Sequence, residues 1–223
     1  MGDIVKYKCL ILDHDDTAVD STASIHYPAH LEVMKHLRPN DSVVSLDEWF
    51  LKNFHPGILE YMRDELHFDP SEMELEYKMW QEYTVGREAE FYPGFLDIIR
   101  EFKNRGGRVA IVSHSTISFI ERDYRRANAS DIPELIFGWH ADSEKRKPSP
   151  YPVNQILEKL KIKAKDALIL DDLKPAVIMG RDSGVDVAAA GWGHQIPEIV
   201  DYMSSRCNYY FKTLDEFKSL LLS

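Results

Sequence analysis

Hydrophobic residues in this chain gather in short continuous runs, separated by longer stretches in which apolar residues recur every three or four positions. A short run bounded by turn residues predicts a strand buried on both faces, and the longer spacing predicts an amphipathic helix. The expected strands are 8–12, 108–112, 135–139, 167–170, 185–189 and 209–211. Their alternation with helices predicts an α/β fold, a Rossmann-like three-layer core in which helices cover both faces of a parallel sheet.

One long segment, 19–91, carries helical patterns and no strand pattern. Two capping-box patterns, Ser45 to Glu48 and Ser71 to Glu74, mark helix starts within it. The expected helices are 21–37, 45–54, 58–66 and 71–83. We therefore expect an inserted all-helical domain over 19–91, and a discontinuous α/β core made of 1–18 and 92–223.

Composition narrows the classes of protein that the chain can belong to. Of 223 residues, 37 are acidic and 27 basic, which gives a net charge of −10 and argues against binding nucleic acid. No apolar run approaches the roughly 18 residues that a membrane span needs, so we expect no membrane partner. The two cysteines suggest no disulfide framework, and we expect a cytoplasmic protein.

The stretch Leu10-Ile-Leu-Asp-His-Asp-Asp-Thr17 holds the densest candidate chemistry. An apolar strand ends there in three closely spaced aspartates, whose mutual repulsion a cation would relieve. Oxygen ligands of this kind suit Mg²⁺. A polar turn that caps a helix is the plain structural alternative.

Other expected strands also end in polar residues. Ser113 follows the second strand, Lys147 lies in a loop between the third strand and the next helix, and Asp171-Asp172 follow the fourth. The carboxyl ends of parallel strands meet at one edge of the sheet, where ligands bind. Carboxylates, a hydroxyl and an ammonium at one edge are suited to Mg²⁺ and a phosphoryl group.

Taken in order, these motifs resemble those of the haloacid dehalogenase-like (HAD) superfamily. The matches are Asp13-x-Asp15-x-Thr17, Ser113 after an apolar strand, Lys147-Pro148, and the acid pair Asp171-Asp172. The helical insert between the first and second motifs resembles the type 1 cap of that superfamily. The resemblance covers most of the core and points to its phosphatase branch, which includes phosphoglycolate phosphatases and β-phosphoglucomutase-like proteins.

The resemblance implies roles for the acidic residues. Asp13 would be the nucleophile that accepts the phosphoryl group, and Asp15 would be the general acid and base. Asp13, the backbone carbonyl of Asp15, and Asp172 would bind Mg²⁺, with Asp171 nearby or assisting.

The resemblance also implies a phosphate site and a supporting residue. Ser113 and Lys147 would bind the phosphoryl oxygens, together with His114, for which the backbone N–H is expected to matter more than the ring. Thr17 would support the first loop. Asp16 departs from the motif, since glycine is frequent at that position, and its charge would oppose phosphate unless it turns outward.

In type 1 caps a loop around a glycine reaches toward the substrate. His55-Pro56-Gly57 is the candidate loop here, and a plain helix–helix turn is the alternative. The candidate substrate contacts in the cap are Lys52, His55, Gly57 and Arg87.

The expected activity is a Mg²⁺-dependent phosphatase acting on a small phosphorylated metabolite, as a monomer or homodimer. Three alternatives stay open: a phosphosugar mutase similar to β-phosphoglucomutase, a 2-haloacid dehalogenase, and a non-catalytic binding protein that retains the fold. The intact acid pair and Asp15 argue against a dehalogenase, which needs no metal.

Overall fold

A computed structural model describes residues 6–223, so the first five residues of the expected core segment lie outside the described range. The chain divides into two compact units. One unit contains the residues up to Asp20 together with Glu90–Ser223, and the other is Ser21–Ala89.

The larger unit is built on a six-stranded sheet in the order β5-β4-β1-β6-β7-β8, and each neighbouring pair is parallel. The strands are β1 Cys9–Leu12, β4 Arg108–Val112, β5 Leu135–Phe137, β6 Ala167–Asp171, β7 Asp186–Ala190 and β8 Tyr209–Phe211. The chain runs outward from β1 in both directions, which places a topological switch point at the carboxyl end of β1. The predicted fold class, a Rossmann-like α/β core, is confirmed.

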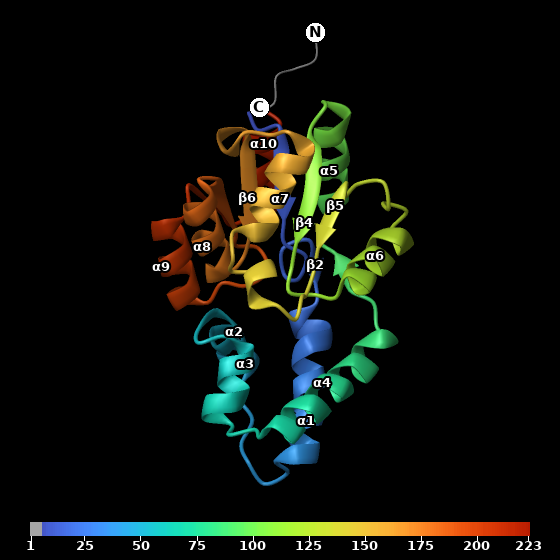
Figure 1. Ribbon diagram of the computed structural model, residues 1–223, viewed down its shortest axis with the longest axis vertical. Helices are drawn as coiled ribbons and strands as arrows, with labels where there is room; N and C mark the ends of the chain where they lie inside the picture. Colours follow the sequence, from blue (N-terminus) through green and yellow to red (C-terminus); the bar gives the residue numbers. More distant parts are fainter. Residues whose placement is uncertain (1–5) are drawn as a thin grey trace. The chain divides into compact units, whose positions relative to one another are not determined.

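Helices cover the sheet. They are α5 Phe95–Asn104, α6 Ile117–Arg126, α7 Tyr151–Leu160, α8 Lys174–Ser183, α9 Pro197–Arg206 and α10 Leu214–Leu221, with short 3₁₀ turns η3 Ser143–Lys145 and η4 Ala164–Asp166. Figure 1 shows α7 in front of the strands. Cys9 and Ile11 are two positions apart on β1 and therefore point to the same face of the sheet. They share a buried cluster with Val153 and Ile156 of α7. All four residues of β1 are buried, and the strand is central in the sheet because it pairs with β4 on one side and β6 on the other.

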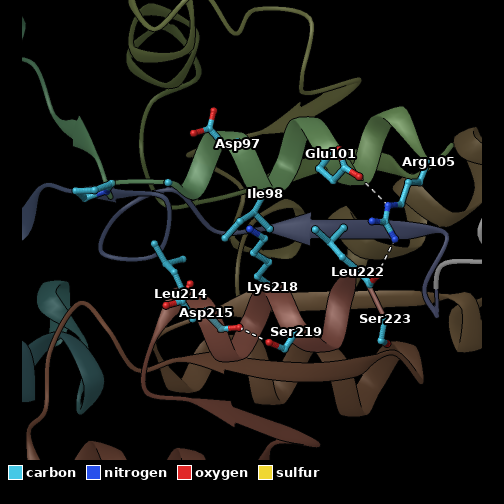
Figure 2. A pocket seen from close by; sticks show the side chains of 12 residues that line it. Asp97, Ile98, Glu101, Arg105, Leu214, Asp215, Lys218, Ser219, Leu222 and Ser223 are labelled. Atoms are coloured by element: carbon cyan, nitrogen blue, oxygen red, sulfur yellow. Dashed lines mark hydrogen bonds and ion pairs between the residues drawn. The ribbon is translucent and has the colours of Figure 1, made fainter.

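The helices α5 and α10 lie side by side and leave an open groove of about 660 Å³ between them (Figure 2). Arg105 of α5 closes one end, because its guanidinium donates a hydrogen bond of 2.7 Å to the carbonyl of Leu222. None of the residues expected at the active site lines this groove, so it does not contribute to the site described below.

The prediction that 19–91 contains no strand is wrong at both ends of the segment. β2 Val19–Asp20 and β3 Glu90–Phe91 pair antiparallel, with Asp20 opposite Glu90. Two residues are too few to show an alternating pattern, and this pair forms because the chain returns to the point where it left the core.

The smaller unit is helical. It contains a π-helical turn η1 Thr22–His26, α1 Tyr27–Leu37, α2 Leu46–Phe54, α3 Ile58–Glu60, a second π-helical turn η2 Tyr61–Glu65, and α4 Pro70–Val85. Its core brings together buried side chains of α1, α2, η2 and the segment just before α4, among them Met34, Trp49, Tyr61 and Phe68. This cluster gives the unit a hydrophobic core of its own.

Two local predictions in helical segments need correction. The capping box of α4 is formed by Asp69 and Glu72, with Pro70 at the first helical position, and not by Ser71 and Glu74. The helix α9, which has Pro197 at its first turn, was not predicted. The Ser45–Glu48 box, by contrast, is present. In residues 6–223 no helix is both long and apolar enough to cross a membrane.

Candidate active site

The carboxyl ends of β1, β4 and β6 lie level with one another. Leu12 of β1 pairs with Ile111 of β4 on one side and with Leu170 of β6 on the other. The backbone N–H of Asp13 continues the ladder by donating to the carbonyl of Leu170 at 2.9 Å. The residues that follow these strands therefore meet at one edge, as the sequence predicted.

Lys147 joins two of the acids at this edge. Its Nζ lies 2.6 Å from Oδ1 of Asp13 and 2.6 Å from Oδ2 of Asp171, and all three side chains are buried. Burial lowers the pKa of Lys147, but the charges of Asp13 and Asp171 outweigh this effect, so the pKa is raised overall. The ammonium therefore stays charged and bridges the first and fourth motifs.

Asp13, Asp171 and Asp172 offer carboxylate oxygens that lie within 4.8 Å of one another. Burial raises the pKa of Asp171 to about 8, with Lys147 opposing the shift and the neighbouring acids adding to it. Burial, followed by the charge of Asp13, raises the pKa of Asp172 well above its usual value. This crowding of buried acids is costly without a further positive charge.

The donor set fits a hard divalent cation. With all three carboxylates ionised, they and the ammonium of Lys147 carry two uncompensated negative charges, which is the charge that Mg²⁺ would neutralise. Carboxylate oxygens are the ligands that this ion prefers, and the three acids are close enough to share it.

Asp15 lies apart from this acidic cluster. Its Oδ2 accepts a hydrogen bond of 2.5 Å from Oγ of Ser115, and Oγ of Ser113 lies 3.5 Å away. Ser115 in turn donates its backbone N–H to Oγ of Ser113 at 3.1 Å. The loop after β4 therefore holds the Asp15 carboxylate, and the expected role of the Asp15 backbone carbonyl as a metal ligand stays a prediction.

The ring of His114 has a contact that the sequence did not suggest. Nε2 lies 3.0 Å from the backbone carbonyl of Lys147, so the ring donates to that carbonyl from its Nε2–H tautomer. His114 thus holds the segment that carries the bridging lysine. The expectation that its backbone N–H meets the phosphoryl group stays untested.

The backbone conformation at Asp16 accounts for the departure from the motif at this position. Its φ of 54° lies in the left-handed region, where glycine is the usual residue and aspartate is tolerated. Its backbone N–H donates to Val19 at 2.8 Å, and the residue is buried. The position therefore demands a backbone conformation, and aspartate meets that demand.

Thr17 contacts one of the clustered acids, Asp172. Its side chain is fully buried, and its Oγ1 donates to Oδ1 of Asp172 across 3.4 Å. The first motif and the fourth are thus in contact through a hydroxyl as well as through Lys147.

The four candidates in the helical unit occupy two places. Lys52 lies 2.5 Å from Glu65, and the Lys52 carbonyl accepts a 3.0 Å hydrogen bond from Gly57, whose φ is 116°. His55 is exposed in the same turn. Arg87 follows α4 instead and stacks on the ring of Tyr83 at 3.4 Å. Their expected contact with substrate stays a prediction.

Sequence reasoning missed several residues at the edge of the sheet, chiefly Ser115, Trp192 and His194. Ser115 follows Ser113 by two positions, and that spacing was the available signal. The other two lie in the loop after β7, and no motif in that loop marks them.

A parallel sheet with buried acids, a bridging lysine and a paired hydroxyl–carboxylate at its switch point defines an α/β enzyme that handles an anionic substrate. The family model described as haloacid dehalogenase-like hydrolase matches residues 10–190. The chain therefore belongs to the haloacid dehalogenase-like hydrolases, and the expectation of an enzyme from the phosphatase branch is confirmed.

Curated relatives are phosphatases by name. A Bacillus cereus pyrophosphatase PpaX is 23% identical over 170 residues, covering 70% of this chain and 78% of the relative. A phosphoglycolate phosphatase of Aquifex aeolicus is 32% identical over 129 residues, covering 56% of this chain and 59% of the relative.

Solved structures share the whole fold. CbbY from Rhodobacter sphaeroides, in complex with phosphate, is 19% identical with a TM-score of 0.74, covering 97% of this chain and 100% of that one. A haloacid dehalogenase-like family hydrolase from Streptococcus pneumoniae is 17% identical with a TM-score of 0.77, covering 96% and 98%. At these identities the likeness concerns the fold.

Proposed function

We propose that this protein is a Mg²⁺-dependent phosphatase that hydrolyses a small phosphorylated metabolite through an aspartyl-phosphate intermediate. The observation that carries the proposal is the buried group of Asp13, Asp171 and Asp172 around Lys147, with the Asp15 carboxylate held separately by Ser115. Acids in two different surroundings can take two different roles.

Asp13 is the nucleophile. It follows a buried strand, so its backbone is fixed, and Lys147 and the strand order direct its carboxylate into the edge of the sheet. In the first step an oxygen of Asp13 forms a bond to phosphorus, and the bond from phosphorus to the leaving oxygen breaks. Asp15 gives its proton to that leaving oxygen.

The second step reverses the proton transfer. Asp15 takes a proton from water while the water oxygen attacks the phosphorus of the aspartyl phosphate. Inorganic phosphate leaves, and Asp13 is regenerated. Ser115 holds the Asp15 carboxylate during both steps, which reduces the conformational freedom that the transition state would have to remove.

Asp13, Asp171 and Asp172 would hold the cation, together with the carbonyl of Asp15. When bound, Mg²⁺ supplies positive charge against the phosphoryl oxygens. Lys147 and Ser113 supply an ammonium and a hydroxyl donor to those oxygens, and His114 keeps the lysine segment in position.

Several features support a small substrate. The relatives are named as pyrophosphatase and phosphoglycolate phosphatase. The helical unit Ser21–Ala89 has its own core, and we propose that it acts as the cap that encloses the substrate.

Cys9 and Cys207 are unpaired, which is consistent with a reducing cytoplasm, and a monomer or homodimer stays the expected state.

A screen of phosphorylated metabolites tests the function. Purified protein is incubated with each compound and Mg²⁺, and released phosphate is measured. At least one small phosphate ester or anhydride should turn over, and Asp13→Asn should abolish this turnover because an amide is a poor nucleophile of nearly the same shape. The matched control is Asp131→Asn, an exposed aspartate of the core unit outside the site. Substantial turnover by Asp13→Asn would refute the mechanism.

A further inference from the structure

The loop Gly191–Gln195, between β7 and α9, lies against the acidic cluster, and none of the motifs accounts for it. Three consecutive residues of this loop contact the first and fourth motifs. Because β7 is the neighbour of β6 in the sheet, the loop leaves the sheet at the same edge as Asp171 and Asp172.

The first two contacts fix the loop on the turn of the first motif. Nε1 of Trp192 donates a hydrogen bond of 3.0 Å to the carbonyl of Thr17. Gly193 packs so closely on the same turn that a Cβ at this position would lie 2.4 Å from the carbonyl oxygen of Asp16. A side chain at position 193 would therefore push the loop away from the turn.

The third contact is with an acid of the cluster. Nε2 of His194 lies 3.2 Å from Oδ2 of Asp172, and the two side chains are 6% and 3% exposed. When Asp172 is ionised for metal binding, its carboxylate can only accept, so the histidine donates from Nε2–H. On the other oxygen, Oδ1, the same carboxylate faces the hydroxyl of Thr17.

Asp172 is thus held at both oxygens, by His194 from the loop and by Thr17 from the first motif. Each carboxylate oxygen keeps a further lone pair for a cation. Neighbours that hold a metal-binding carboxylate set its orientation before the ion arrives, and removing such a neighbour typically weakens metal affinity 10- to 100-fold.

We propose that His194 is a positioning residue that orients Asp172 for binding the divalent cation, and that the Gly191–Gln195 loop is the element that keeps it there. The inference rests on the proposed function, in which Asp172 is a metal ligand. It assigns part of the metal affinity to a residue outside the four motifs.

Metal binding itself tests the inference. Isothermal titration of the full chain with Mn²⁺, and with Mg²⁺ in competition, gives affinities without any substrate. His194→Phe, which keeps a ring but has no donor, should raise the Kd about 10- to 100-fold. His194→Gln, whose amide can donate to Asp172, should recover most of the lost affinity. The matched control is His36→Phe, an exposed histidine of α1, which should bind as the wild type does.

The outcomes separate the inference from the function it rests on. If the wild type binds no divalent cation, the proposed Mg²⁺ dependence fails. If the wild type binds and His194→Phe binds equally well, the inference is overturned and the proposed function stands. Equal weakening in His194→Phe and His194→Gln also overturns it, because the donor would then be irrelevant. Thermal melting identifies a variant that does not fold, and His194→Leu then replaces the phenylalanine variant in the same comparison.

Discussion

Asp15 is half-buried, and its carboxylate contacts the hydroxyl groups of Ser115 and Ser113. Asp13 is buried beside the ammonium of Lys147. This difference in surroundings allows the two acids to take different roles in the reaction. We predict that Asp15→Asn slows turnover of substrates with poor leaving groups by about 10²–10⁴-fold, the usual span for general acid–base catalysis. Turnover of p-nitrophenyl phosphate should suffer less, because its leaving group departs without a proton.

The comparison of kcat for the two substrate types checks this prediction. Ser115→Ala serves as a companion variant, since it leaves the acid in place and removes the hydroxyl that holds it. It should show the same preference for the good leaving group, with a smaller loss. An equal loss for both substrate types in Asp15→Asn would contradict the acid role.

At the scale of elements, two helices of the smaller unit each bury a titratable group. His30 of α1 is stacked on Trp49 at 4.0 Å, and neither of its ring nitrogens has a hydrogen-bond partner among the described residues. Burial lowers its pKa from 6.5 to about 4. Glu76 of α4 is also buried, and burial raises its pKa from 4.5 to about 7.

These two groups have opposite effects on stability. Below pH 6.5 the unfolded chain binds a proton at His30, whereas the folded chain does not bind it until the pH nears 4. The free energy of unfolding therefore falls as pH drops toward 4. Above pH 4.5 the unfolded chain releases a proton at Glu76 that the folded chain keeps, so the free energy of unfolding falls as pH rises toward 7. Between these limits the two slopes oppose each other.

We therefore predict that single variants reveal two pH dependences of the free energy of unfolding that partly cancel in the wild type. Relative to the wild type, His30→Phe should make the free energy of unfolding fall further as pH rises from 4.5 to 6.5, because the opposing contribution of His30 is removed while that of Glu76 stays. Relative to the wild type, Glu76→Gln should make it rise over the same range, and each difference from the wild type amounts to a change on the order of 3 kcal/mol. Urea unfolding at several pH values measures this. Parallel pH profiles for the two variants would show that these groups do not control the stability.

At the scale of the whole molecule, the chain passes between the two units at two adjacent points. Asp20 and Glu90 face each other in the β2–β3 pair, and the helical unit begins and ends beside them. A unit with its own core that is joined by one short paired connection can rotate as a body.

We predict that the helical unit moves when the site is filled. Fluorescent labels at Glu74→Cys in α4 and Lys165→Cys in the core, both exposed, in a Cys207→Ser background, should report a change in transfer efficiency when Mg²⁺ and orthovanadate are added together. Lys147→Ala, which lacks the ammonium that we propose binds the anion, is the control and should show no change. Constant efficiency in the parent chain would rule out a moving cap.

The sequence by itself determined the order of the six strands of the core sheet and the polar residues that follow them. Continuous apolar runs identify strands buried on both faces, and the polar residues that follow them meet at one edge of any parallel sheet. Asp13, Ser113, Lys147 and Asp171 could be found in this way, because the rule depends only on chain order.

The tertiary structure alone decided which groups touch. Three histidines, His14, His114 and His194, have no informative spacing in the sequence, yet they contact Asp123, the carbonyl of Lys147, and Asp172 respectively. The β2–β3 pair is equally invisible, since two residues carry no period. These contacts join positions that lie 22 to more than 100 residues apart. Local sequence patterns do not predict such pairs, because only the packing of the folded chain brings the partners together.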